Sequence, residues 1–173
     1  YISFMQTTRS IDLVLKMADI PLTAFSMHLI PRTTLAQKMD ALSSQANIAG
    51  YKAVLTASSR LGKYMPLLMT AAGTIRPSKT LVLGAGVAGL QAIATAKRLG
   101  AQVEAFDVRP IVKEQVESLG AKFIEVENNL EDAEGEGGYA KETSEDYKRK
   151  QQDLIHKHIS NADVVITTAL IPG

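Results

Sequence analysis

The 173-residue sequence contains no cysteine and has a formal net charge of only +1. The absence of cysteine excludes disulfides and thiolate metal sites. With 21% charged residues, this balance suggests neither a disordered tail nor a nucleic-acid surface. The most apolar run, residues 81–96, is interrupted by three glycines and Gln91, so it predicts no transmembrane helix. The composition is that of an ordinary globular protein.

Several catalytic signatures are also missing. His156 and His158 lie two residues apart, so on a helix they point to different faces, and together with His28 they do not have the spacing of metal ligands. No tyrosine is followed four residues later by lysine, which excludes the Tyr-Lys pair of short-chain dehydrogenases, and there is no G-x-S-x-G nucleophile elbow. We therefore expect no metal site.

The first thirty residues have the pattern of a βαβ unit. Residues 1–4 and 21–27 read as strands, and residues 10–20 between them place four apolar side chains at helical spacing. Two strands joined by a helix usually pair in parallel. We predict a partial N-terminal α/β domain over residues 1–33.

An interdomain helix and connector are predicted over residues 34–76. Thr34 is the expected N-cap, with Gln37 as its capping-box partner, and Gly50 is a possible interruption. The apolar stripe of this helix would consist of Leu35, Met39, Leu42, Ala46, Ala49 and Ala53. Residues 70–79, with one glycine and one proline, read as a connector.

The opposite face of this predicted helix is polar but uncharged after Asp40. Gln37, Asp40, Ser44 and Asn47 fall on it at helical spacing, and Ser43 lies beside them. The spacing alone favours an ordinary solvent-exposed face of a capped helix, and the alternative is a face turned towards a ligand.

The clearest motif is a G-x-G-x-x-G formed by Gly84, Gly86 and Gly89, between a buried strand at 80–84 and a helix at 87–100. Gly84 permits the tight turn, Gly86 lets the backbone approach a pyrophosphate, and Gly89 lets the helix pack closely on the strand. The phosphates would sit at the positive end of the helix. The pattern predicts a dinucleotide-binding domain.

An acidic residue stands where this motif expects one. Asp107 follows a predicted strand at 102–106, eighteen residues after Gly89, and it would bind the adenosine ribose 2′-hydroxyl. An acid there repels a 2′-phosphate and so favours NAD over NADP. Arg109 could accommodate a phosphate, but beside Asp107 we interpret it as a neighbour of the adenine or as a surface charge.

The remaining pattern extends this domain over residues 77–173 as a Rossmann-like, doubly wound parallel sheet. Further strands are predicted at 122–126 and 163–169, with a helix after Pro110 and another capped by Ser144. Residues 127–143 between them form a long acidic loop with three glycines before Tyr139. Such a loop is either a lid over a site or a solvated excursion.

Several segments together closely resemble the NAD(H)-binding component, domain I or alpha subunit, of proton-translocating nicotinamide nucleotide transhydrogenases. They are RTTLAQKMDALSSQANIAGY, MTAAGT, GAGVAGLQAIATAKRLGA, KEQVESLGAKF, GGYAKE and TTALIPG. The resemblance implies two Rossmann-like domains with the nucleotide between them, and hydride transfer to NADP(H) bound on a partner domain. Strand-like sequence at both ends of the chain leads us to expect a segment of a longer protein.

The resemblance also implies site residues. The positions that orient the nicotinamide, assigned as catalytic, are Arg32, Gln37, Asp40 and Ser43, with Tyr51 in support. Those that bind NAD(H) are Gly84, Gly86, Val87, Ala88, Gly89, Asp107, Val108, Arg109, Tyr139, Thr168, Ala169 and Leu170. The chemistry agrees, because hydride transfer between two nicotinamides requires orientation more than an acid-base pair.

The same resemblance implies the partners. These are the NADP(H)-binding and membrane-spanning components of the enzyme and a second copy of this chain, with no nucleic acid and no insertion of this segment into the membrane. The location would be peripheral to an energy-transducing membrane.

Two other functions remain open. Alanine dehydrogenases share the architecture but carry a catalytic histidine after the strand equivalent to residues 1–4, where this chain has Phe4, Met5 and Gln6. The second alternative is a non-catalytic module in which NAD binding controls a membrane partner.

Overall fold

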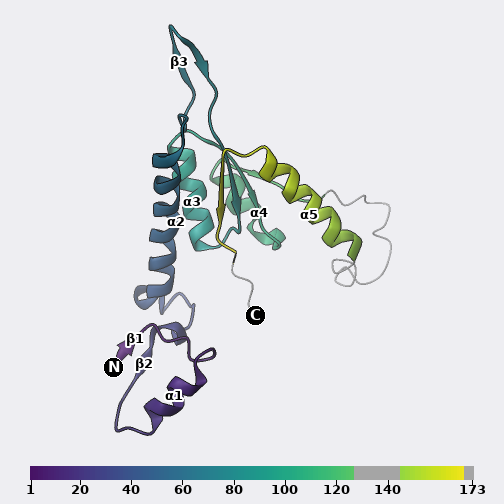
Figure 1. Ribbon diagram of the computed structural model, residues 1–173. Helices are drawn as coiled ribbons and strands as arrows, with labels where there is room; N and C mark the ends of the chain where they lie inside the picture. Colours follow the sequence, from purple (N-terminus) through teal and green to yellow (C-terminus); the bar gives the residue numbers. More distant parts are fainter. Residues whose placement is uncertain (127–144, 170–173) are drawn as a thin grey trace. The chain divides into compact units, whose positions relative to one another are not determined.

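The computed structural model describes residues 1–126 and 145–169, and the chain divides into two compact units, residues 1–48 and 49–173 (Figure 1). In the first unit, strands β1 (Ile2–Ser3) and β2 (Phe25–Ser26) pair in parallel, and helix α1 (Ile11–Ala18) connects them. A 3₁₀ turn, Met27–Leu29, follows β2. The predicted βαβ unit is confirmed.

The long helix begins later than predicted. Helix α2 spans Ala41–Arg60, and a 3₁₀ turn at Gln37–Met39 precedes it. The expected cap at Thr34 is wrong because Asp40 caps the helix: Asp40 Oδ1 accepts the Ser43 N–H at 2.9 Å and Oδ2 accepts the Ser43 hydroxyl at 2.6 Å. Gln37 therefore lies outside the helix and does not share a helical face with Ser44.

The predicted apolar stripe of α2 is only partly correct, because of its six residues Ala53 packs against the core while Leu35 and Ala49 are exposed. Leu35 is 93% exposed because it lies before the helix. The helix instead buries Gly50 and Val54, and Ala57 and Leu61 continue that face against the core of the second unit. The helix is not interrupted at Gly50.

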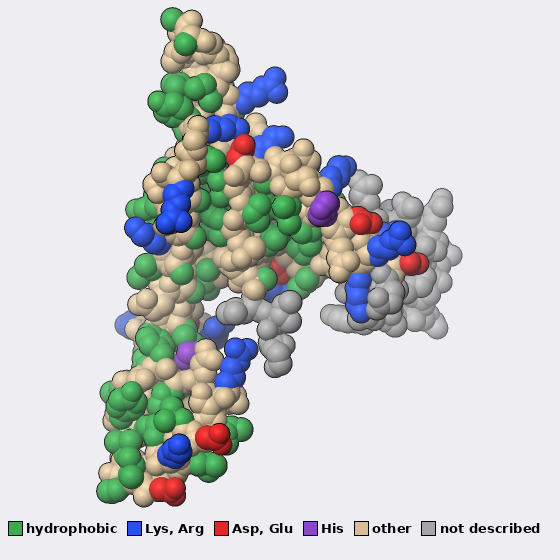
Figure 2. All heavy atoms as spheres, viewed as in Figure 1, with side chains coloured by type: hydrophobic (Ala, Val, Ile, Leu, Met, Phe, Trp, Pro, Cys, Tyr) green, Lys and Arg blue, Asp and Glu red, His purple; other side chains and the backbone are tan. Residues whose placement is uncertain are grey.

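A β-hairpin replaces the expected connector. Strands β3 (Leu68–Thr70) and β4 (Gly73–Ile75) pair antiparallel, with Leu68 opposite Ile75. Hydrophobic side chains lie on its surface (Figure 2), and Met69 is 73% exposed.

The second unit contains a four-stranded parallel sheet in the order β7-β6-β5-β8. In chain order its elements are β5 (Lys79–Leu83), α3 (Val87–Arg98), β6 (Gln102–Phe106), a 3₁₀ turn (Pro110–Val112), α4 (Lys113–Ser118), β7 (Lys122–Phe123), α5 (Glu145–Ser160) and β8 (Val164–Thr167). Strand β5, which comes first along the chain in this sheet, lies between β6 and β8. The direction in which successive strands are added therefore reverses at β5. This is the doubly wound topology, and ligands bind at the carboxyl ends of the strands at such a reversal. The predicted fold class is confirmed.

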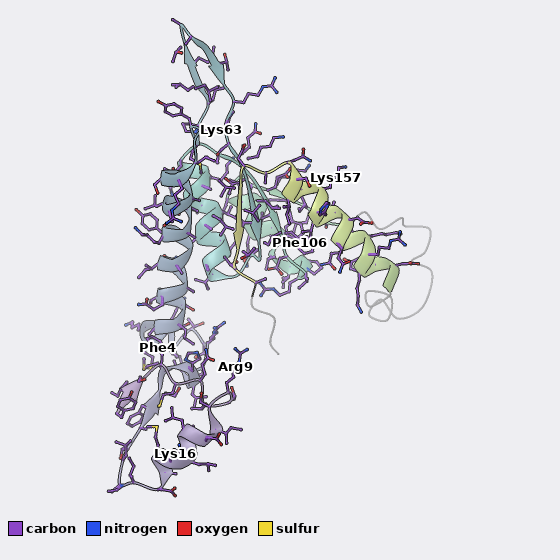
Figure 3. All side chains as sticks on the ribbon, in the orientation of Figure 1. Phe4, Arg9, Lys16, Lys63, Phe106 and Lys157 are labelled. Carbon is purple, nitrogen blue, oxygen red and sulfur yellow. The ribbon has the colours of Figure 1, made fainter. Side chains whose placement is uncertain are left out.

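Alternation along the strands explains the two faces of this sheet. Val82, Val103 and Ala105 belong to the large core that includes residues of α2, α3 and α4. Leu81 and Phe106 point to the opposite face, where Ile155 of α5 packs against them. Figure 3 labels Phe106 in the sheet and Lys157 on α5. Strands covered on both faces contain continuous apolar runs, as β5 does at Leu81, Val82 and Leu83.

Three predictions fall outside the described residues: the loop at 127–143 with Tyr139, the Ser144 cap, and Leu170. Within residues 1–126 and 145–169, no helix is long and apolar enough to cross a membrane. The same residues contain no cluster of acidic and histidine side chains that could hold a metal ion.

Candidate functional site

The glycine motif forms a tight turn at the carboxyl end of β5. Gly84 has φ +101°, a conformation that side-chain-bearing residues rarely adopt, and a Cβ there would lie 2.8 Å from the Thr168 hydroxyl. The end of β8 braces the turn, because the Thr168 N–H donates to Leu83 O at 2.8 Å and its hydroxyl donates to Gly84 O at 3.0 Å. The turn therefore lies between β5 and β8, at the reversal point of the sheet.

The other two glycines have different surroundings. A Cβ on Gly89 would lie 1.8 Å from Gly84 O, so this glycine permits the close packing of α3 on the turn, as predicted. A Cβ on Gly86 would meet nothing within 4 Å, and Gly86 is exposed. The backbone at Gly86 is thus open to a ligand.

The amino end of α3 suits an anion. Gly86 is the N-cap, and among the described residues no side chain caps the helix and its first turn carries no acid. The first N–H groups of a helix have no intrahelical acceptor and carry the positive end of its dipole. Val87 is exposed and Ala88 partly buried. The residues present fit the pyrophosphate of a dinucleotide.

Asp107 lies directly after β6 and is joined to the glycine turn. Its Oδ2 accepts the Ala85 N–H at 2.7 Å, and its Oδ1 accepts the Arg109 N–H at 2.9 Å. Burial alone would raise the pKa of this carboxyl, but hydrogen bonds from Arg109 and Ala85 outweigh it, and the pKa lies below its usual value. Sequence reasoning identified the acid and missed the Ala85 N–H, which lies 22 residues away.

The Arg109 side chain binds the same carboxylate. Its Nε donates to Asp107 Oδ1 and its terminal nitrogen donates to Oδ2, both at 3.0 Å. The sequence interpretation of Arg109 as a neighbour of adenine or a surface charge did not foresee this two-armed contact. Val108, between the two, is 74% exposed, and Ala169 beyond Thr168 is also exposed.

Gly50 of α2 packs against the first turn of α3, a contact that the sequence did not predict. A Cβ on Gly50 would lie 2.0 Å from Ala88 O in the first turn of α3. The sequence contains a signal for this contact, because a glycine inside a helical pattern costs about 1 kcal/mol relative to alanine and usually has a packing reason.

The set expected at the nicotinamide lies in residues 1–48, apart from Tyr51. Asp40 and Ser43 are in direct contact, and the Ser43 hydroxyl hydrogen bond is the largest cause that lowers the pKa of Asp40, with the charge of Arg32 a smaller one. Gln37 is exposed and contributes its carbonyl to the turn before α2. Tyr51 is 47% exposed. The structure thus joins Asp40 to Ser43 and leaves the Gln37 side chain open.

Known proteins resemble this chain over nearly its whole length. Residues 53–173 match the model of the family described as Alanine dehydrogenase/PNT, C-terminal domain. A Rickettsia prowazekii (strain Madrid E) protein, named as the first part of NAD(P) transhydrogenase subunit alpha, is 60% identical over 152 residues, which are 88% of this chain and 39% of that protein. The Rhodospirillum rubrum protein of the same name is 56% identical over 153 residues, 88% of this chain and 40% of that protein.

Solved structures agree. A transhydrogenase from Sinorhizobium meliloti is 51% identical, has a TM-score of 0.84, and is matched over 99% of this chain and 45% of its own. An L-alanine dehydrogenase is 22% identical with a TM-score of 0.65, over 99% of this chain and 42% of its own, which shows a shared fold alone. The chain spans about two fifths of the length of the curated relatives named above.

Proposed function

The chain belongs to the family described as Alanine dehydrogenase/PNT, C-terminal domain, and from this premise we propose that it is the NAD(H)-binding part of a proton-translocating NAD(P) transhydrogenase. The observation that carries the proposal is 60% identity, over 88% of the chain, to a protein named as the first part of NAD(P) transhydrogenase subunit alpha. The alanine dehydrogenase structure is far more distant, at 22% identity.

The glycine turn and α3 would hold the pyrophosphate of NAD(H). Gly86 leaves room for it, and the free N–H groups that follow would donate to its oxygens. Asp107 would accept a hydroxyl of the adenosine ribose, as acids at the end of the second strand do in this topology. Thr168 and Ala169 at the end of β8 border the same turn.

Bound NAD(H) would supply the hydride, and the protein would supply orientation. Transfer between two nicotinamides moves no proton to a substrate, so the residues needed are those that fix a ring and its carboxamide. Arg32, Gln37, Asp40 and Ser43 are proposed for that role. The Asp40–Ser43 contact would hold two of these groups in fixed positions, while the exposed Gln37 amide keeps its donors and acceptor for a ligand.

The proposal extends to an assembly. Hydride would pass to NADP(H) on a partner component, with proton translocation by a membrane-spanning component, and this chain would form a homodimer peripheral to an energy-transducing membrane. Its relatives are named as the first part of a subunit alpha, which supports the existence of further components.

Single-turnover hydride transfer tests the proposal. The full natural chain, mixed with its purified NADP(H)-binding partner, should oxidise NADH and reduce an NADP analogue at equal rates. An alanine dehydrogenase would instead oxidise NADH with pyruvate and ammonium and would not need the partner. A sensor would bind NADH and transfer nothing, and failure to bind NADH would reject all three.

A further inference from the structure

The carboxylate of Asp107 has no free acceptor position. A carboxylate offers about four lone-pair directions. Asp107 fills them with the N–H groups of Ala85 and Arg109 and with two guanidinium nitrogens of Arg109, at 2.7 to 3.0 Å. A ribose hydroxyl therefore cannot donate to this carboxylate unless one existing donor leaves.

Only the guanidinium is free to leave. The Ala85 and Arg109 N–H groups belong to the backbone, so no rotation of a side chain can remove them from the carboxylate. The Arg109 side chain is 55% exposed, while the Asp107 side chain beneath it is only 6% exposed. The guanidinium thus covers the carboxylate from the solvent side, the side from which a ligand arrives.

We propose that the Arg109 guanidinium is a displaceable cover on Asp107 and that it sets the discrimination between NAD(H) and NADP(H) in this component. The inference rests on the proposed function. It replaces the NAD(H)-binding role that the resemblance implies for Arg109 with a role in specificity. An incoming ribose displaces the guanidinium and takes its place on the carboxylate. An incoming 2′-phosphate instead finds the guanidinium already in place as a cation.

The charges explain the direction of the effect. Asp107 alone repels a 2′-phosphate, which is why an acid at this position favours NAD. The two-armed contact offsets that negative charge and offers a guanidinium, whose planar fork binds phosphate well. Arg109 therefore weakens NAD(H) binding by competition and strengthens NADP(H) binding by attraction. Removing its charge should increase the difference in affinity between NAD(H) and NADP(H).

The test compares Arg109→Met, which keeps an unbranched side chain about as long as the arginine stem up to Nε and removes every side-chain donor, with Arg98→Met as the matched control. Arg98 is exposed at the far end of α3. NADH and NADPH are titrated by their fluorescence against the full natural chain, free of its NADP(H)-binding partner, and thermal unfolding checks the fold of each variant. Wild-type NADH binding is measured first, because its absence rejects the proposed function rather than this inference.

In Arg109→Met we expect NADH affinity to be retained or increased. The ratio of the NADPH to the NADH dissociation constant should rise by about tenfold, which corresponds to the loss of one charge-assisted hydrogen bond to the 2′-phosphate. Arg98→Met should leave the ratio unchanged. A ratio within twofold of wild type, or an NADH affinity lowered by more than twofold, overturns the inference. Arg109→Lys is the second variant: it keeps the charge without the two-armed contact, so it should retain NADPH binding and strengthen NADH binding, and weaker NADH binding there also overturns the inference.

Discussion

Substituting alanine for Gly50 tests how α2 supports the glycine turn. Two effects of opposite sign compete. Alanine is the better helix former and should stabilise α2 by about 1 kcal/mol. The new Cβ, however, would lie 2.0 Å from Ala88 O and 2.9 Å from Ala88 C.

The steric clash should outweigh the gain in helix propensity, because the atoms that the new Cβ meets belong to the backbone of Ala88. The Cβ would be about 1.4 Å short of ordinary van der Waals contact, and no side-chain rotation relieves a clash with a carbonyl. Helix α2 or the first turn of α3 must move, and overpacking of this kind costs about 1 to 3 kcal/mol. After the gain in helix propensity of about 1 kcal/mol, we expect Gly50→Ala to lower the free energy of unfolding by up to about 2 kcal/mol.

A second readout links the clash to the site. Ala88 lies two residues after Gly86, so a displaced first turn moves the N–H groups proposed for the pyrophosphate. We expect NADH affinity to fall by about tenfold, which corresponds to the loss of one hydrogen bond. The assay is urea unfolding followed by circular dichroism, with NADH titration alongside. Gly62→Ala is the control, since a Cβ there meets nothing within 4 Å. A Gly50→Ala variant at least as stable as wild type would refute the packing argument.

Three other predictions follow. Asp107→Asn should weaken NADH binding by about 1.5 to 3 kcal/mol and relax the discrimination against NADPH, as measured by titration. Gln37→Asn should leave thermal stability nearly unchanged, because Asp40 caps α2, while slowing single-turnover hydride transfer about a hundredfold if the amide positions the nicotinamide; a rate within about twofold of wild type would remove Gln37 from the site. Asp163 accepts hydrogen bonds from Lys63 and from the Lys79 N–H, which lower its pKa below 3.8. Its contribution to stability, about 0.5 kcal/mol at this partly exposed pair, should be present above pH 3.8 and lost as the pH falls through the lowered pKa, a dependence that acid unfolding of Asp163→Asn should lack.

Most of the parallel sheet could be predicted from the sequence because its signals are local. Strand β6 matches the predicted residues 102–106, since apolar residues alternate with polar ones between Gly100 and Asp107 and leave little choice of register. The roles of Gly84 and Gly89 also follow from their positions between a strand and a helix. What the sequence does not contain is the partner of each group across the fold.

The start of α2 shows how two local signals can compete. Thr34 and Gln37 have the spacing of a capping box, and Asp40 and Ser43 repeat the same spacing six residues later. The second pair wins because a carboxylate accepts two hydrogen bonds, from the N–H and the hydroxyl of Ser43, where a threonine hydroxyl would accept one from the backbone. The hairpin at 68–75 was missed for a different reason: its strands are only three residues long, too short for an alternating pattern.

Asp107 couples the two halves of the proposed dinucleotide site, and this coupling is visible only in the folded chain. The Ala85 N–H belongs to the glycine turn but donates to Asp107, so it is not available to a phosphate. The pyrophosphate must then use the N–H groups from Gly86 onwards, at the start of α3. If Asp107 is neutralised, the Ala85 N–H loses a charged acceptor, and the hydrogen bond that holds the second residue of the turn is weakened. A substitution at Asp107 should therefore weaken contacts to the pyrophosphate as well as to the ribose.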